Sequence, residues 1–181
     1  MEGGLNGWKG FVAEGELESG MAYFSPATKT EEFIALAWYL EGGSRRFYSE
    51  LLSIVVDEET VALYKELAKE EENHQMELMK LYRDFLGPEA DPGFPETIIS
   101  QGKDEILEPG VLINQALQWA RGKREAEILE FSLSLETNAF DLYIKMERQV
   151  RDKRSSMIFL LLSEQEKRHL ELLTSLFEKR V

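Results

Sequence analysis

The two histidines of this sequence each follow a glutamate by three positions. The pairs are Glu71/His74 and Glu166/His169, and the chain has no further histidine. On a helix, positions i and i+3 lie on one face, so each pair can direct a carboxylate and an imidazole at a single point. Carboxylate oxygen and imidazole nitrogen together suit iron and manganese. The two motifs therefore predict metal binding.

Two further glutamates precede these pairs at a constant distance. Glu41 precedes Glu71 by 30 residues, and Glu136 precedes Glu166 by the same number. Buried carboxylates repel each other and need protons or cations, and two divalent metals supply the required charge. One glutamate from each of two helices, with Glu-x-x-His from each of two others, is the ligand pattern of carboxylate-bridged di-iron and di-manganese bundles.

The expected metal site has six ligands and two ions. The ligands are Glu41, Glu71, His74, Glu136, Glu166 and His169. Each metal takes one imidazole and one terminal carboxylate, while two carboxylates bridge the pair. Two iron ions are the expected cofactor, with manganese or zinc as alternatives, and zinc would supply no redox chemistry. An isolated Glu-x-x-His is usually a solvated pair, but here leucines flank the motifs and place them inward: Leu67, Leu78, Leu162 and Leu173.

Two tyrosines and four other glutamates lie near the predicted ligands in the sequence. Tyr48 and Tyr143 follow the single glutamates by seven residues, which is two helical turns along the same face. We expect them either to pack in the core or to hydrogen-bond a metal-bound carboxylate of the opposite hairpin. The glutamates that fall off the inward face are expected to be surface charges: Glu70, Glu72, Glu164 and Glu171.

Four long helices are predicted to position these residues. Their expected ranges are 28–55, with a Thr28/Glu31 capping box; 57–86, with Asp57 as N-cap; 123–150; and 152–179, with Asp152 at its start. Each helix exceeds 20 residues, which favours a helical bundle over a mixed fold.

A long crossover is expected between the two helical pairs. Residues 87–110 contain four of the five prolines and are expected to be loop and turn, and a short helix is expected over 111–119. The whole segment, 87–122, is long enough to run the length of a bundle. Shifting residues 30–82 by 95 positions places Glu41 on Glu136 and His74 on His169. We therefore expect an all-α four-helix bundle made of two repeated antiparallel hairpins.

Composition excludes several kinds of partner and site. The 181 residues include 34 acidic and 21 basic residues, for a net charge of −13. This acidity argues against nucleic acid and anionic membranes, which need clustered Lys and Arg. The sequence has no cysteine, which excludes disulfides, thiolate sites and iron–sulfur clusters from it. Without a long apolar run or a signal-peptide pattern, we expect one cytoplasmic domain.

The helical segments resemble the rubrerythrin-like branch of the ferritin-like superfamily over about residues 28–180. The resemblance is carried by LAWYLEGGSRRFY, KELAKEEENHQMEL, SLETNAFDLY and SEQEKRHLELL. It implies a ferritin-like di-metal bundle over 27–181, with the six residues as ligands and with Glu71 and Glu166 bridging. It also implies an oxidoreductase that reduces peroxide or dioxygen with electrons from an external donor protein, and we expect a homodimer.

Two departures from that family leave the function open. Rubrerythrins usually carry an extra carboxylate three residues after the third-helix glutamate, where this sequence has Ala139. Full-length rubrerythrins also carry a cysteine-rich rubredoxin module, which this sequence lacks. A ferroxidase centre of an iron-storage protein and a non-enzymatic bundle that holds metal are the alternative functions, because the ligand set serves all three.

Residues 1–26 are expected to form an N-terminal extension. The segment GGLNGWKGFVAEG resembles the end of rhodanese-like domains, where a Gly-Gly turn precedes a tryptophan. This favours the tail of a rhodanese-like domain fused ahead of the bundle, and an ordinary glycine-rich leader is the alternative. Without a cysteine, this sequence cannot itself carry sulfurtransferase activity.

Overall fold

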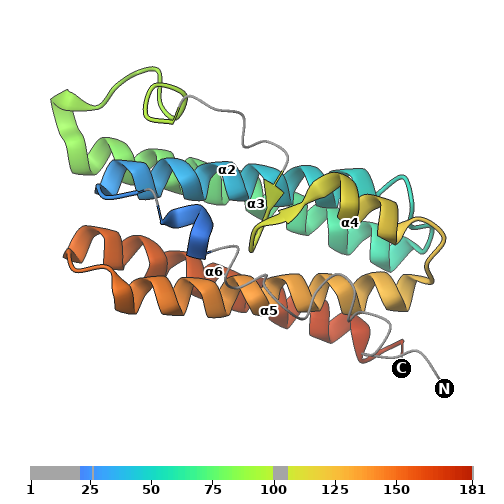
Figure 1. Ribbon diagram of the computed structural model, residues 1–181. Helices are drawn as coiled ribbons and strands as arrows, with labels where there is room; N and C mark the ends of the chain where they lie inside the picture. The colour runs from blue at the N-terminus through green and yellow to red at the C-terminus, as the bar shows by residue number, and fades with distance from the viewer. Residues whose placement is uncertain (1–20, 26, 100–105, 181) are drawn as a thin grey trace.

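The computed structural model describes residues 21–25, 27–99 and 106–180, and it is dominated by four long helices (Figure 1). These are α2 (Thr30–Leu51), α3 (Glu58–Leu86), α5 (Glu125–Gln149) and α6 (Lys153–Phe177). The shorter elements are η2 (Gly87–Glu89), β1 (Ile106–Leu107), β2 (Val111–Leu112) and α4 (Ile113–Ala120). The predicted all-α class is confirmed. No helix of the described residues is both long and apolar enough to cross a membrane.

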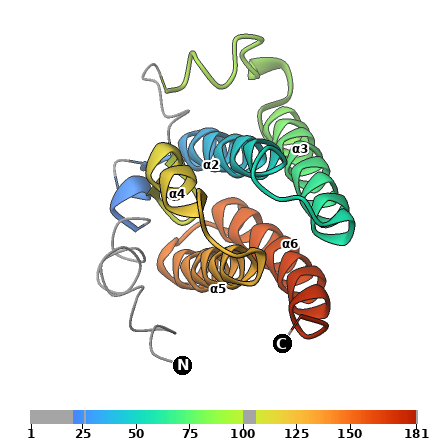
Figure 2. The same cartoon turned by 90° about the vertical axis from the view of Figure 1, so that its right-hand side faces the viewer.

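The long helices pack in two pairs. Helix α3 lies along α2, and α6 lies along α5. Short loops, residues 52–57 and 150–152, join the members of each pair, so the two helices of a pair run in opposite directions. Figure 2 views the helices end-on and shows the α2/α3 pair facing the α5/α6 pair, with α4 beside α2. This arrangement turns one face of every long helix toward a common centre.

Two of the predicted helix starts are confirmed by their caps. The Asp57 carboxylate accepts a hydrogen bond from the backbone N–H of Thr60 at 3.0 Å, and α3 begins directly after it. The Asp152 carboxylate accepts from the N–H of Ser155 at 2.8 Å at the start of α6. Each cap satisfies a backbone donor that the first turn of a helix leaves free. The two capped helices therefore begin within a residue of their predicted starts.

The first long helix differs from its predicted range of 28–55. It begins at Thr30, and the capping carboxylate belongs to Glu32, whose Oε2 accepts the N–H of Thr28 at 2.7 Å. The expected Thr28/Glu31 box is therefore wrong by one position. The helix also ends early, at Leu51, where the N–H groups of Ser53 and Ile54 bond to the carbonyls three residues before them, at 3.1 and 2.8 Å, and form a tighter turn.

The crossover is more ordered than the loop and turn predicted for residues 87–110. Strands β1 and β2 form a short antiparallel pair in which Ile106 pairs with Leu112. Strand β1 lies directly against α2 at Gly43, where an added Cβ would be 2.0 Å from the carbonyl oxygen of Ile106. Only glycine allows this approach of strand to helix. The crossover is therefore held against α2 in the middle of that helix.

Two apolar clusters form the core, one toward each end of the long helices. One contains Phe47, Leu51, Tyr64, Leu67, Phe131, Leu135 and Leu173, and helix α4 also packs into it. The other contains Phe33, Leu40, Leu78, Leu142, Phe159 and Leu162. Burying each Leu or Phe contributes about 1.5–3 kcal/mol of transfer free energy. In each long helix the predicted ligands fall between the two clusters, so apolar packing holds them in place from both sides.

The described part of the N-terminal extension packs on the helices. Residues 21–24 form a helical turn, and the side chain of Phe24 is buried. Its ring meets that of Phe159 edge-on, with centroids 5.3 Å apart. The segment that resembles a rhodanese-like domain lies within residues 1–20, outside the described residues.

Candidate metal centre

The structure brings all six predicted ligands into one buried cluster. Helix α2 supplies one glutamate, α5 supplies another, and α3 and α6 each supply a Glu-x-x-His pair. The exposed fractions are 0% for Glu41, Glu71, Glu166 and His169, 3% for Glu136 and 7% for His74. Removing four carboxyl groups from water in this way is costly unless protons or cations accompany them.

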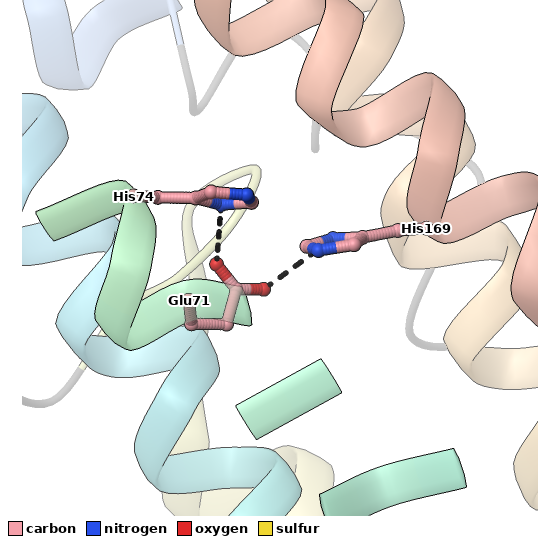
Figure 3. A group of neighbouring side chains, drawn as sticks. All are labelled: Glu71, His74 and His169. Atoms are coloured by element: carbon pink, nitrogen blue, oxygen red, sulfur yellow. Dashed lines mark hydrogen bonds and ion pairs between the residues drawn. The ribbon is translucent and has the colours of Figure 1, made fainter. Parts of the chain in front are cut away.

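The carboxylate of Glu71 lies beside the two imidazole rings and contacts both, as Figure 3 shows. One of its oxygens, Oε2, is 3.3 Å from Nδ1 of His74, and the other, Oε1, is 3.6 Å from Nδ1 of His169. The two rings are stacked with their centroids 5.0 Å apart. A single carboxylate of α3 thus reaches an imidazole of each helical pair, which is the geometry that a bridging ligand requires.

The single glutamates each contact the histidine of their own helical pair. Oε2 of Glu41 lies 2.9 Å from Nδ1 of His74, and Oε2 of Glu136 lies 3.2 Å from Nδ1 of His169. Glu166 can share a metal position with Glu41 and His74, and also with Glu136 and His169, since the ligand atoms of each trio lie within 4.8 Å of one another. Glu71 and Glu166 therefore both reach the two halves of the cluster.

The two central glutamates hold protons when no cation is present. Burial raises the pKa of Glu71 well above its usual range, and the charge of Glu41 raises it further. Burial and the charge of Glu136 likewise raise the pKa of Glu166. Metal ions would displace these protons, because carboxylate ligands bind in their ionised form.

The two outer glutamates stay ionised. Burial opposes ionisation of Glu41, but the nearby His74 outweighs it and lowers the pKa of that carboxyl. Burial also opposes ionisation of Glu136. A hydrogen bond with the Glu166 carboxyl group and the nearby His169 outweigh it and lower the pKa of Glu136 to about 2. Burial disfavours the charged ring of His169, yet the charge of Glu136 raises the pKa of His169 above its ordinary value. Each half thus contains one ionised carboxylate beside one imidazole.

Several oxygens of the predicted ligands lack hydrogen-bond donors, and the donor set fits bound metal. In their ionised form, Oε1 of Glu41, Oε1 of Glu71 and both oxygens of Glu166 accept no hydrogen bond among the described residues. Buried polar atoms without partners are rare and require an explanation. Cations would supply one here, because four carboxylates and two imidazoles are suitable ligands for iron or manganese.

The two tyrosines at equivalent positions of the repeats behave differently. The hydroxyl of Tyr48, on α2, donates a hydrogen bond to Oε1 of Glu136, on α5. Burial and the charge of Glu136 raise the pKa of Tyr48 well above its usual range, so the hydroxyl keeps its proton. The hydroxyl of Tyr143 has no hydrogen-bond partner in the described residues, and its ring packs beside Phe159. Only Tyr48 holds a ligand of the opposite pair.

Glu70 is only partly exposed, whereas the sequence analysis expected a surface charge. Its side chain is 14% exposed, and its Oε2 lies 3.5 Å from Nε2 of His169, the nitrogen that faces away from the cluster. Its Oε1 pairs with Arg168 at 2.7 Å. The two atoms are close but make no hydrogen bond, and an outer carboxylate that hydrogen-bonds a metal-binding histidine would orient its ring and raise its basicity. Its partners lie on α6, so the periodicity of α3 alone contains no signal for it.

Glu108, in the turn between β1 and β2, is a buried carboxylate that the sequence analysis missed. It is 2% exposed, and its ligand atom lies within 4.8 Å of those of Glu41 and Glu71. Burial, with repulsion from Glu166 and Glu41, raises the pKa of Glu108 well above its usual range. The segment was expected to be loop, and it has no helical periodicity that would indicate an inward face.

A surface hollow leads to the cluster at His74. It has a volume of about 270 Å³ and lies between α3 and α6, with Asn73, Gln165 and Arg168 also in its wall. Three glutamates line it as well: Glu70, Glu77 and Glu164. Because His74 is the most exposed of the six predicted ligands, a small molecule or ion would meet the cluster first at this residue.

Comparison with known proteins supports a relation over part of the chain. Residues 127–181, which include three of the six predicted ligands, match the rubrerythrin family. Among solved structures, the chain is similar to a hypothetical protein of Pyrococcus furiosus, Pfu-1136390-001, at 22% sequence identity. The similarity covers 83% of this chain and 89% of that chain with a TM-score of 0.56, which supports a shared fold. No protein among the curated sequences matches.

Proposed function

We propose that this chain is a rubrerythrin-like protein, a ferritin-like four-helix bundle of two repeated hairpins that holds two iron ions and reduces peroxide or dioxygen. The observation that carries the proposal is the position of Glu71 between His74 and His169 in a buried cluster with three further carboxylates. The match of residues 127–181 to the rubrerythrin family supports the same class.

The six residues would hold the ions in two halves. Glu41 and His74 would be the outer ligands of one ion, Glu136 and His169 those of the other, and Glu71 and Glu166 would bridge them. Two redox-active ions in such a site supply electrons to an O–O bond. The protein's own groups set the protonation and orientation of the ligands, because Glu71 and Glu166 release their protons on metal binding and Tyr48 fixes Glu136.

The burial of the cluster favours a very small substrate. The described ligands are at most 7% exposed, and His74 lines a surface hollow. Peroxide and dioxygen are small enough to pass such an opening. Electrons would come from a donor outside these 181 residues, since the sequence contains no cysteine for a thiolate or iron–sulfur centre.

Anaerobic loading with ferrous iron tests this proposal. We expect about two iron ions per chain, and the optical spectrum should change when hydrogen peroxide is added. The double variant Glu71→Gln/Glu166→Gln should lose most of the iron, because both bridging carboxylates are removed. The control Glu72→Gln/Glu171→Gln changes exposed glutamates of the same two helices and should retain it. Wild-type protein that takes up no iron would contradict metal binding, and iron-loaded protein inert to peroxide would favour a non-enzymatic metal protein.

A ferroxidase function is the second candidate, favoured by the acidic wall of the hollow. Glu70, Glu77 and Glu164 line it beside His74, so negative charge would attract ferrous ions to the entrance. In a storage protein, the same centre would oxidise iron that then leaves for a mineral core. Light scattering separates the two functions, because storage requires a particle much larger than a dimer or tetramer.

A further inference from the structure

Glu108 breaks the symmetry of the cluster. The two repeats cover residues 30–82 and 125–177, and Glu108 lies in the crossover between them. It therefore has no counterpart in the second hairpin. Its ligand atom groups with those of Glu41 and Glu71, on the α2/α3 side of the cluster. Among the described residues, Glu108 forms no such group with Glu136 or His169, the outer ligands of the opposite half.

The fold holds Glu108 in place by its backbone and by one of its two oxygens. The N–H of Glu108 donates to Oγ of Ser44 at 3.3 Å, and the same hydroxyl donates to Oε2 of Glu108 at 3.4 Å. Gly43 permits this contact, because its missing side chain leaves room for the carbonyl of Ile106. The turn thus contacts Gly43 and Ser44 of α2, which follow Glu41 by two and three positions.

The other oxygen of Glu108 is available to a cation. Oε1 is buried and has no hydrogen-bond partner among the described residues. The residue as a whole is only 2% exposed, so water cannot readily supply the missing donor. Its acidic neighbours include Glu41, Glu71 and Glu166, whose negative charges would repel its own if no cation were bound. A side chain that serves only to fasten the crossover would need Oε2 and the backbone N–H alone. The unpartnered oxygen indicates a ligand.

We propose that Glu108 is a seventh ligand and that it makes the two metal positions unequal. This inference rests on the proposed function, since it assumes that the cluster binds metal. With Glu71 and Glu166 shared, the position of Glu41 and His74 would have four carboxylates, Glu108 among them, and should fill first. The position of Glu136 and His169 would have three and should fill second. Oxygen-rich sites suit manganese and iron, and an additional carboxylate increases the attraction for a divalent cation.

The additional carboxylate also changes the charge of the loaded cluster. Four ionised glutamates balance two divalent cations, so Glu108 supplies one negative charge more. That charge matches the gain of one positive charge when an ion passes from the divalent to the trivalent state. The position beside Glu108 is therefore the one that better stabilises the oxidised ion.

Calorimetric titration of metal-free protein with Mn²⁺ tests the proposal without any measurement of activity. Wild-type protein should show two binding events of different affinity. Glu108→Gln should weaken the tighter event by roughly tenfold to a hundredfold and leave the weaker one unchanged. The control Glu96→Gln, at an exposed position of the same crossover, should bind as wild type does.

The outcomes distinguish the role of Glu108 from metal binding by the cluster as a whole. Two unchanged events in Glu108→Gln would overturn the role of Glu108 while leaving metal binding intact. The absence of any Mn²⁺ binding by wild-type protein would overturn the proposed function itself. If circular dichroism shows that Glu108→Gln is unfolded, Glu108→Asp provides the same test, because it keeps the charge but withdraws the oxygen from the cluster and should weaken the same event.

Discussion

Oε1 of Glu71 lies 3.6 Å from Nδ1 of His169, although one residue belongs to α3 and the other to α6. This is one of the contacts that join the two helical pairs through their polar centre. Glu71 reaches His74 of its own helix with its second oxygen, at 3.3 Å. A carboxylate in this position couples the two halves of the cluster, so a substitution of either histidine should change the metal affinity of both halves.

The tyrosines Tyr48 and Tyr143 provide a matched pair of substitutions. Tyr48→Phe removes the hydrogen bond to Glu136 and leaves a buried ionised carboxylate with one donor fewer. We expect a loss of about 1–3 kcal/mol in the free energy of unfolding of the metal-free protein. Tyr143→Phe removes a hydroxyl that has no partner, so its effect should be within about 0.5 kcal/mol. Denaturant unfolding measures both, and equal losses would contradict the assigned asymmetry.

The adjacent glycines Gly42 and Gly43 should differ in their tolerance of alanine. A Cβ at Gly43 would lie 2.0 Å from the backbone carbonyl oxygen of Ile106, which can move only with strand β1. A Cβ at Gly42 would lie 2.7 Å from Nε2 at the end of the Gln75 side chain, which can shift if it gives up its hydrogen bond to the carbonyl of Trp38. We expect Gly43→Ala to cost about 2–3 kcal/mol in stability and Gly42→Ala less than about 1 kcal/mol. Thermal unfolding under identical conditions checks this. A smaller loss of stability for Gly43→Ala than for Gly42→Ala would show that β1 does not pack against Gly43.

The outer carboxylate of Glu70 should control the metal position that contains His169. Glu70→Gln weakens the interaction with Nε2 of that histidine, 3.5 Å away, and frees Arg168. Loss of such an outer partner typically lowers metal affinity tenfold to a hundredfold. Glu164→Gln, an exposed change in the wall of the same hollow, is the control. Competition with a chelator gives the metal affinities. Identical affinities for the two variants would contradict a role of Glu70 in metal binding.

The stability of the metal-free protein should fall as the pH rises from about 5 to 8. The pKa values of Glu71, Glu108 and Glu166 are raised well above the ordinary 4.5, first by burial and then by neighbouring carboxylates. Above pH 4.5 the unfolded chain releases protons that the folded protein still holds, so the stability that these groups contribute is lost with rising pH. The raised pKa of His169 acts in the same direction.

Thermal unfolding in the presence of a chelator measures this dependence. The lowered pKa values of Glu41 and Glu136 act in the opposite direction, but only in the acid range below about pH 4.5. Saturating Mn²⁺ should reverse the trend above pH 5, because binding displaces the retained protons and strengthens with pH. Glu108→Gln should flatten the metal-free curve. A metal-free midpoint that rises from pH 5 to 8 would contradict the pKa directions.

The helices show what local sequence can and cannot predict. The caps of Asp57 and Asp152 could be predicted because each is formed within one turn. The cap of α2 was placed one residue early, since Glu31 and Glu32 offer similar carboxylates and only the packed helix selects between them. The strand pair of the crossover could not be predicted from two residues on each side, because its stability comes from contact with α2 at Gly43.

The sequence by itself determined which face of each long helix carries Glu41, Glu71, Glu136 and Glu166, because the phase of a helix follows from the spacing of its residues. The equal 30-residue spacings placed those glutamates at matching heights in the two pairs. Tertiary structure alone decided the surroundings of that centre. Glu108 is buried because the crossover docks on α2, and Tyr48 and Tyr143 differ because only Tyr48 meets a carboxylate across the core. Such contacts depend on what a distant segment presents, and local periodicity contains no information about it.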